Sequence, residues 1–378
     1  MSYQKDCRWF TGYKPCKYKR SCTNCPNVSK VSHHIAIVSL DAMGAVIRAT
    51  CLLPAINRKY PDAHITWITY PQCTALLKNN PMTDRIISFN AQSVPLLSKL
   101  RFDILFAVDK SLEAGGLSET IQADKKFGFG LSETGVIQPF TDEASYQYDV
   151  GLNDELKFYK NQKPETQQIT ESMGLEWKRD PYILELTQEE SDQSQKIRHS
   201  MLNPDPKRQQ PLSGVIGYNT GCSLLFPNKK LTVEKSIEQI RQWRKNFPDH
   251  SVALLGGPED TDRQVQMKDA FKDDPLVINT PTRDGLRQGL VWMNAADMVF
   301  SGCSLGMHMA IALKKKVIAW FGVSCLQEID LYDRGIRIQS DVSCSPCWKK
   351  QCNEKIMCYD RVDLVKVMDA TKKLLTTD

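Results

Sequence analysis

Short apolar runs alternate with segments of helical periodicity from residue 33 onward. The run HHIAIVSL (33–40) predicts a buried strand, and apolar residues then recur at helical spacing from Val46 to Ile56, with Pro61 marking the end of the helix. Further buried strands are predicted at 64–69, 85–89 and 103–109. Continuous apolar strands separated by helices are typical of a parallel sheet that is covered on both faces.

The same alternation begins again after a polar stretch at 159–210, which we interpret as a connection with surface helices. The predicted strands of this second half are 214–219, 252–257, 276–279, 297–302 and 316–322. We therefore expect an α/β protein with two doubly wound halves. Ligands of such folds bind beyond the carboxyl ends of the strands, and a cleft between two halves is the natural active site.

Length and composition support this division. The 378 residues exceed the usual size of one hydrophobic core. The chain has 49 basic and 44 acidic residues, which gives a net charge of +5. This excess of positive charge is too small to predict nucleic-acid binding. No apolar run approaches the roughly 20 residues that span a bilayer, and the first residues lack the apolar core of a signal peptide. We expect a cytoplasmic protein, with peripheral contact at the inner membrane left open.

Four segments occur in an order and at a spacing that together resemble glycosyltransferase family 9, the ADP-heptose heptosyltransferases. They are SLDAMGAVIRATCLLPAINRKYPDAHITWIT (39–69), IGYNTGCSLLFPNKKLT (216–232), LLGGPEDTDR (254–263) and NAADMVFSGCSLGMHMAIALKKKVIAWFG (294–322). The resemblance implies a GT-B fold, in which two Rossmann-like domains face a cleft. It also implies inverting transfer of a heptose from ADP-heptose to a cell-envelope glycan or a protein, as in lipopolysaccharide biosynthesis.

The corresponding domain boundaries follow from the pattern and the resemblance. We expect a cysteine-rich metal knot at 1–30, an acceptor domain at 31–200, a nucleotide-sugar domain at 201–343, and a cysteine finger with a last helix at 344–378. The partners implied are a nucleotide-sugar donor and a glycan or protein acceptor, with no nucleic acid. The oligomeric state stays open.

The turn SGCSLGMH (301–308) follows a predicted strand and opens a helix, so its backbone N–H groups and the helix dipole can hold a diphosphate. By resemblance, Lys229 binds phosphate and Asp260 contacts the nucleotide ribose. The resemblance also places Ser304, Gly306 and His308 at the donor pyrophosphate. Further candidates for substrate contact are Gly44, Arg48, Asn219 and Thr220. Without the resemblance, Lys229 is more often a solvated surface residue, and His308 more often a core or capping residue.

Two positions depart from the family pattern. The family places an aspartate after the glycine of its first turn, whereas this chain has Gly44-Ala45, so Asp41 is the substitute candidate for the catalytic base. Its alternative role is a turn or helix-cap residue. The second departure is Cys303, where the family often has aspartate. These changes leave two alternatives to transfer: a catalytically inactive GT-B-like binding or scaffold protein, and a nucleotide-sugar epimerase or hydrolase.

Eight of the thirteen cysteines form two groups near the chain ends. Cys344, Cys347, Cys352 and Cys358 are sufficient for a tetrahedral four-sulfur site, and autotransporter heptosyltransferases, by resemblance, hold iron in a similar finger. Cys7, Cys16, Cys22 and Cys25 are spaced more widely, so zinc, iron and an iron–sulfur cluster all remain open. We expect one or two structural iron or zinc sites and no catalytic metal. The basic and aromatic residues around the first group would surround the metal, or touch an acceptor, lipid headgroups or RNA.

Overall fold

The computed structural model describes residues 3–204 and 210–376. The chain divides into two compact units, each of which draws on more than one stretch of sequence. Unit 1 comprises Met1–Ala42, Cys51–Asp149 and Gln167–Asp180, and unit 2 comprises Met43–Thr50, Val150–Thr166 and Pro181–Asp378. A short stretch of the first half, Met43–Thr50, therefore packs with the second half of the chain.

Unit 1 is built on a six-stranded sheet in the order β3-β2-β1-β4-β5-β6. Its strands are β1 (His34–Val38), β2 (His64–Thr69), β3 (Arg85–Ser88), β4 (Arg101–Ala107), β5 (Gln122–Leu131) and β6 (Ile137–Pro139). All neighbouring pairs are parallel except β5 and β6. The chain builds outward from β1 in one direction and from β4 in the other, so the sheet has a topological switch point between these two strands.

The helices of unit 1 are short. They are α2 (Leu52–Lys59), α3 (Thr74–Leu77), α4 (Val94–Lys99) and α5 (Leu112–Thr120), while the residues of α6 (Ser145–Leu152) and α7 (Glu165–Ser172) are divided between the two units. One face of the sheet packs its apolar residues against Leu97 of α4 and against Ala114 and Leu117 of α5. This burial fixes β1 and β4 in the centre of the sheet and thereby the turns that follow them.

Unit 2 has a second six-stranded sheet, in the order β12-β11-β10-β7-β8-β9, with every neighbouring pair parallel. Its strands are β7 (Gly214–Asn219), β8 (His250–Leu255), β9 (Val277–Asn279), β10 (Met298–Gly302), β11 (Lys316–Phe321) and β12 (Gly335–Gln339). Both units are thus Rossmann-like parallel sheets with helices, as the sequence predicted.

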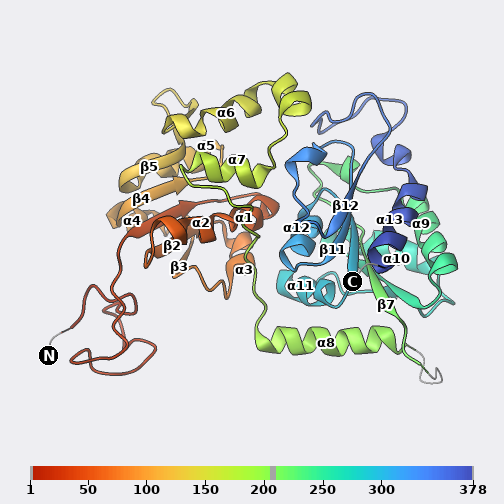
Figure 1. The fold of residues 1–378 in the computed structure, drawn as a ribbon, viewed down its shortest axis with the longest axis horizontal. Coiled ribbons are helices and arrows are strands. Elements are labelled where there is room, and N and C mark those ends of the chain that lie inside the picture. The colour runs from red at the N-terminus through yellow and green to blue at the C-terminus, as the bar shows by residue number, and fades with distance from the viewer. Residues whose placement is uncertain (1–2, 205–209, 377–378) are drawn as a thin grey trace. The chain divides into compact units, whose positions relative to one another are not determined.

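The helices of unit 2 cover its sheet on both sides (Figure 1). They are α8 (Gln188–Leu202), α9 (Val233–Asn246), α10 (Thr261–Asp269), α11 (Leu286–Asn294), α12 (Leu305–Ala312) and α13 (Leu364–Thr376), while α1 (Met43–Ala49) packs on α12. Helices α9, α10 and α13 share a core with the strands that centres on Trp243 and Trp320. Helices α11 and α12 lie on the opposite side of the sheet (Figure 1). In the described part of the chain, no helix combines the length and the apolar character needed to cross a membrane.

Most predicted strands are confirmed, and the differences have physical causes. The helix predicted from Val46 to Ile56 is two helices, because the chain turns at Thr50, whose hydroxyl donates to the Ile47 carbonyl at 2.5 Å. Strands β5, β6 and β12 were not predicted. Each lies at or next to a sheet edge and has exposed or half-exposed positions, so its sequence lacks a continuous apolar run.

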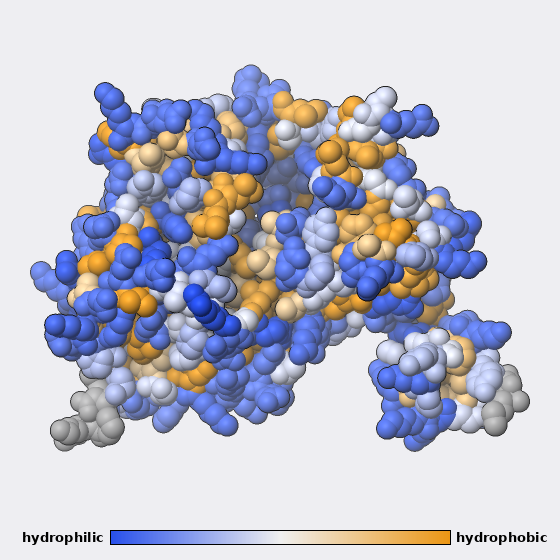
Figure 2. All heavy atoms as spheres, turned by 180° about the vertical axis from the view of Figure 1, so that it is seen from behind, coloured by the Kyte–Doolittle hydropathy of each residue, from blue (hydrophilic) through white to orange (hydrophobic). Residues whose placement is uncertain are grey.

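The N-terminal segment is attached to unit 1 through Arg8. Its guanidinium binds the Asp84 carboxylate at 2.7 and 2.8 Å and donates to the carbonyls of Asp62 and Ala63. The segment carries a surface that is mostly hydrophilic, seen at the lower right of Figure 2. Lys17 lies over the Trp9 ring, 3.4 Å from its centroid, so the basic and aromatic residues here contact each other.

Candidate functional site

In unit 2 the carboxyl ends of β7 and β10 lie side by side at a topological switch point, where the chain turns outward in opposite directions. Asn219, the last residue of β7, links these two ends. Its side-chain amide donates to the Gly221 carbonyl and to the hydroxyls of Ser301 and Ser304, each at 3.0 Å. The side chain therefore holds the turn after β7 against the turn that begins α12.

Helix α12 begins immediately after this turn, with Ser304 as the N-cap residue in extended conformation. The Ser304 side chain does not cap the first turn of α12, and its hydroxyl accepts a hydrogen bond from Asn219 instead. Gly306 permits the close approach, since a Cβ there would lie 2.3 Å from Asn219 Oδ1. A helix start without a side-chain cap presents N–H donors and a positive dipole end to an anion.

His308 is buried on the inner side of α12, with 6% of its surface exposed. Its Nδ1 lies 3.3 Å from the Tyr182 hydroxyl. Burial lowers the pKa of His308 well below its usual value, and the positive charges of Arg48 and Lys229 lower it further. The imidazole is therefore neutral at physiological pH and acts through hydrogen bonds.

Lys229 and Lys230 have different surroundings, although they are adjacent. The Lys229 Nζ lies 4.7 Å from the Phe226 ring centroid and 4.4 Å from that of Trp348. The Lys229 backbone is packed against Gly302, where a Cβ would lie 2.0 Å from the lysine carbonyl oxygen. Lys230 instead approaches a carboxylate, with its Nζ 4.0 Å from Asp260 Oδ1.

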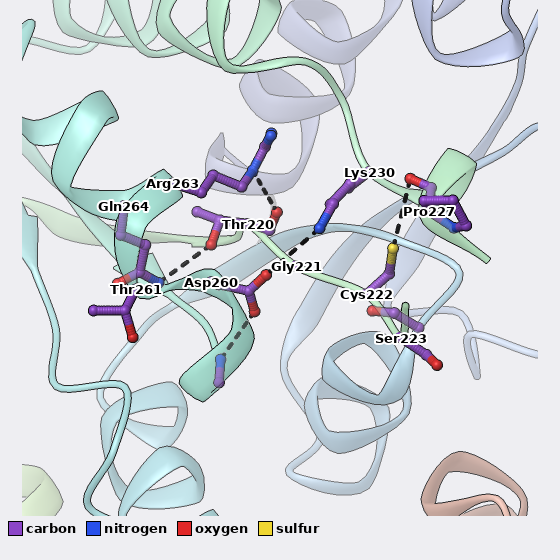
Figure 3. Close-up of polar contacts among 12 residues, drawn as sticks. Thr220, Gly221, Cys222, Ser223, Pro227, Lys230, Asp260, Thr261, Arg263 and Gln264 are labelled. Carbon is purple, nitrogen blue, oxygen red and sulfur yellow. Dashed lines mark hydrogen bonds and ion pairs between the residues drawn. The ribbon is translucent and has the colours of Figure 1, made fainter. Parts of the chain in front are cut away.

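Asp260 follows β8 and is 5% exposed. Its Oδ2 accepts a hydrogen bond from the Gly257 N–H at 3.0 Å (Figure 3). Its Oδ1 lies near the Lys230 ammonium but accepts no hydrogen bond from a described residue. Burial raises the pKa of this carboxyl group, although the Gly257 N–H and the charges of Lys230 and Arg263 oppose the shift. A buried oxygen without a partner is costly unless a ligand or water donates to it.

The neighbouring Thr220 serves the fold. Its hydroxyl donates to the Leu255 carbonyl at 3.0 Å and accepts from the Gln264 amide at 3.2 Å, and Arg263 donates to its carbonyl (Figure 3). Thr220 thus lies beside Asp260 and Lys230, but its hydroxyl is engaged within the unit.

Helix α1 brings Gly44 and Arg48, the other two candidates for substrate contact, into unit 2. Arg48 Nη2 binds Glu165 Oε1 at 2.5 Å. Burial opposes the charge of Arg48, but Glu165 and other neighbouring groups, among them Cys303, hold its pKa above the ordinary value. A second ion pair lies in the same environment, where Lys157 Nζ is 3.1 Å from the buried Glu328. Burial and the charge of Glu165 raise the pKa of Glu328, and Lys157 opposes that shift.

Unit 1 has its own pair of carboxylates at the switch point between β1 and β4. Asp41 lies exposed in the turn between β1 and α1. Asp109 follows β4 and accepts hydrogen bonds from the backbone N–H of Leu40, from that of Asp41 at 3.1 Å, and from the Ser39 hydroxyl at 3.2 Å. Burial raises the pKa of Asp109 to about 6 against the lowering effect of these bonds, and the Asp41 charge adds to the rise.

The sequence and fold comparisons point to one family. Residues 216–357 match the family model described as "Glycosyltransferase family 9 (heptosyltransferase)". This match covers both switch-point turns of unit 2, Lys229, Asp260 and the beginning of α12. This part of the chain is similar to glycosyltransferase family 9. The match supports the predicted glycosyltransferase, and no curated protein matches the sequence.

Solved structures with the same fold extend over nearly the whole chain. A family 9 glycosyltransferase of Veillonella parvula has a TM-score of 0.67 at 17% identity, covering 91% of this chain and 97% of that one. The ADP-heptose LPS heptosyltransferase II of E. coli has a TM-score of 0.65 at 15% identity, with coverages of 90% and 98%. The iron-containing dodecameric glycosyltransferase TibC of enterotoxigenic E. coli has a TM-score of 0.52 at 10% identity, with coverages of 91% and 76%. These likenesses establish the GT-B type of fold for both units.

The cysteines of both groups, near the two chain ends, are free thiols. Within the described residues, no three Cys, His, Asp or Glu side chains are arranged to hold a metal ion, so the predicted metal knots are not shown. Burial raises the pKa of Cys358 to about 11, and the charges of Cys347, Cys352 and Cys344 contribute to the rise.

Sequence reasoning missed one residue of unit 1 and two side-chain contacts of unit 2. Asp109 could have been found, because it ends a predicted buried strand at the carboxyl edge of the sheet, where ligands bind. The pairing of Arg48 with Glu165 joins residues 117 positions apart and leaves no periodic signal. The contact of Trp348 with Lys229 likewise joins a loop of the cysteine finger to a distant turn.

Proposed function

We propose that unit 2 binds a nucleoside-diphosphate sugar at the carboxyl ends of β7 and β10, and that the protein transfers this sugar to an acceptor. The first turn of α12, at Ser304 to His308, would contact the diphosphate together with Lys229. The Asp260 carboxylate would accept a hydrogen bond from a ribose hydroxyl. The observation that carries the proposal is the combination of a helix start that the N-cap side chain leaves uncapped and a buried Asp260 Oδ1 that accepts no hydrogen bond from a described residue, both within the region that matches the family.

The chemistry follows from charge development. When the bond between sugar and diphosphate breaks, the leaving group becomes more negative. The N–H donors of α12 and the Lys229 ammonium would then stabilise the transition state more than the ground state. The neutral His308 adds a hydrogen-bonding group without a second cation. Asp41 of unit 1 is the proposed acceptor of the proton from the acceptor hydroxyl, and the reaction needs no metal in this scheme.

For the donor we propose ADP-heptose, and for the acceptor a cell-envelope glycan or a protein, reached by inverting displacement. In support, one structure with this fold is named an ADP-heptose LPS heptosyltransferase, and TibC was solved in complex with ADP-D-β-D-heptose. Such a role would place the protein in the cytoplasm, with peripheral contact at the membrane that carries the glycan.

Calorimetry with ADP and UDP tests the donor site. We expect the wild-type protein to bind ADP, and Lys229→Ala to weaken binding by about tenfold or more, because a charge-assisted phosphate contact contributes about 1.5–3 kcal/mol. The matched control is Lys245→Ala, which removes an exposed lysine at the end of α9 and should leave affinity unchanged. If the wild-type protein binds neither nucleotide at millimolar concentration, the proposal is wrong.

A binding or scaffold protein without catalysis is the second candidate, and it is favoured by Ala45, which replaces the aspartate of the family pattern. A turnover assay distinguishes the transferase from the scaffold. If the protein is a transferase, incubation with ADP-heptose and cell-envelope extract should release ADP and label an acceptor. Binding without release favours the scaffold. Release without labelling favours a hydrolase, and a changed sugar favours an epimerase.

We also propose that Cys344, Cys347, Cys352 and Cys358 hold one structural iron or zinc ion. The four thiols lie between residues 344 and 358 of the sequence and offer the sulfur donors that these metals accept, and TibC, whose fold is similar, is described as iron-containing. Cys7, Cys16, Cys22 and Cys25 are the proposed ligands of a second site, where an iron–sulfur cluster is the alternative. A metal ion bound by four thiolates has no open coordination position, so it would only stabilise the fold.

A further inference from the structure

Trp348 belongs to the cysteine finger, directly after Cys347, and its ring reaches the loop that carries Lys229. The ring centroid lies 4.4 Å from the Lys229 Nζ and 5.6 Å from the Phe226 ring, which stands almost perpendicular to it at 85°. The Lys229 ammonium thus lies close to two aromatic rings from different segments of unit 2. Lys157 approaches the same tryptophan at 5.0 Å.

This environment suits a lysine that must bind an anion. Among the described residues, no carboxylate forms an ion pair with Lys229, whereas Lys230 lies 4.0 Å from Asp260 and Lys157 lies 3.1 Å from Glu328. A carboxylate partner would compete with phosphate for the ammonium. Aromatic faces attract and orient the cation but leave its charge uncompensated.

The backbone of the finger holds the ring in place. The N–H groups of Cys347 and Trp348 both donate to the Val323 carbonyl, at 3.1 and 2.9 Å, and the Ser345 hydroxyl donates to the Gly322 carbonyl at 2.5 Å. Trp348 itself has φ +50°, a left-handed conformation that is unfavourable for a bulky residue and persists only where the surroundings impose it. Backbone strain of this kind concentrates at functional sites.

We infer that Trp348 is a positioning residue for Lys229: it holds the ammonium toward the first turn of α12, so that the cysteine finger sets the affinity for the donor diphosphate. The inference rests on the proposed function of Lys229 as a phosphate-binding residue. The loop of Lys229 lies beside the turn that leads into α12, since a Cβ on Gly302, the last residue of β10, would lie 2.0 Å from the Lys229 carbonyl oxygen.

The test is a double-mutant cycle of Trp348→Leu and Lys229→Ala, read by calorimetry with ADP. Trp348→Leu should raise the Kd for ADP about 3- to 30-fold, the range of a partly desolvated cation–π contact. In the Lys229→Ala background the same change should have no further effect. Trp348→Phe keeps an aromatic face and should restore most of the affinity. A purely structural role of Trp348 would instead give equal losses in both backgrounds and no recovery with phenylalanine, and would overturn the inference.

A second readout does not depend on nucleotide. Lysine acetylation by a small acylating reagent, followed by mass spectrometry, reports how well each amine is shielded. Trp348→Leu should speed labelling of Lys229 about two- to fivefold and leave Lys230 unchanged, with circular dichroism showing that the variant is folded. Unchanged labelling of Lys229 contradicts the inference. If labelling changes as expected but the wild-type protein binds no nucleotide, the contact is confirmed while the proposed function fails.

Discussion

A Cβ atom on Gly44 would lie 2.9 Å from Cδ2 of His308, closer than such atoms approach in folded proteins. Helix α1 can therefore lie against α12 only because position 44 lacks a side chain. The imidazole cannot move aside easily, because it is buried and contacts the Tyr182 hydroxyl. This relationship gives Gly44 a packing role that does not require contact with a substrate.

Gly44→Ala should accordingly destabilise the protein by about 1–3 kcal/mol, the usual cost of an overpacked position. Denaturant unfolding measures the change. The matched control is Gly289→Ala in α11, where a Cβ would lie 4.0 Å from the nearest atom outside its own helix, Met309 Cε, so the helix should gain up to about 1 kcal/mol. Equal changes in the free energy of unfolding of the two variants would show that α1 does not pack on His308 as described.

The pH dependence of stability should reveal the neutral state of His308. Its folded pKa lies well below the usual value, so between the two values the unfolded chain binds a proton that the folded protein does not. Stability is therefore fully present above about pH 6.5 and falls as the pH is lowered. Unfolding free energies at pH 5 to 8 should show a smaller acid loss for His308→Gln than for wild type. His199→Gln, at an exposed position of α8, should follow wild type, and parallel curves for all three would contradict the prediction.

The central strands of both sheets could be predicted from sequence, because burial on both faces leaves runs such as GVIGYN with no polar side that would obscure them. Strand β5 could not, since its first half carries Lys125 and Lys126 and is largely exposed. The donor-site candidates follow strands at the carboxyl edge of the sheet, which is why their proximity could be anticipated. Contacts such as that between Trp348 and Lys229 depend on how an irregular finger packs, and local patterns carry no information on this.

Asp109 should titrate far above an ordinary aspartate. Its pKa is raised to about 6, so between about pH 4 and 6 the folded protein binds a proton that the unfolded chain releases. The contribution of this group to stability is greatest below about pH 4 and declines as the pH rises through 6. The free energy of unfolding of Asp109→Asn, measured across this pH range beside wild type, should lack that decline. Glu133→Gln, at an exposed position, serves as the control, and an unchanged slope in Asp109→Asn would refute the shift.

Metal content and stability should change together at the C-terminal finger. Elemental analysis should find iron or zinc in the wild-type protein, and Cys352→Ser should lose it. A metal present at a thousandfold its Kd stabilises by about 4 kcal/mol, so the melting temperature should fall by about 10 °C. Cys303→Ser, outside the set, should retain its metal. If the wild-type protein contains no metal, the prediction of a metal site in the finger is wrong. A brown protein containing sulfide would indicate an iron–sulfur cluster instead.

The catalytic base is the prediction with the most at stake, because Ala45 cannot accept a proton and the turn after β1 must supply another group. Asp41 is exposed in that turn, and its backbone N–H is held by Asp109 at 3.1 Å, so the position of the carboxylate is supported by a second carboxylate. General-base assistance contributes about 10²–10⁴ in rate, and Asp41→Asn removes the basicity while keeping shape and most hydrogen bonding.

Asp41→Asn should therefore lower the rate of sugar transfer at least about a hundredfold, while the affinity for ADP and the melting temperature stay close to wild type. Because the Asp41 charge helps to raise the pKa of Asp109, the variant should also show a lower Asp109 pKa, which confirms that the two groups interact. Asp149→Asn, at an exposed position of α6, is the control for loss of a surface carboxylate. If Asp41→Asn keeps most of its activity, Asp41 is only a turn residue. If the wild-type protein is inactive and Ala45→Asp creates transfer, the chain is a binding protein whose turn has lost its base.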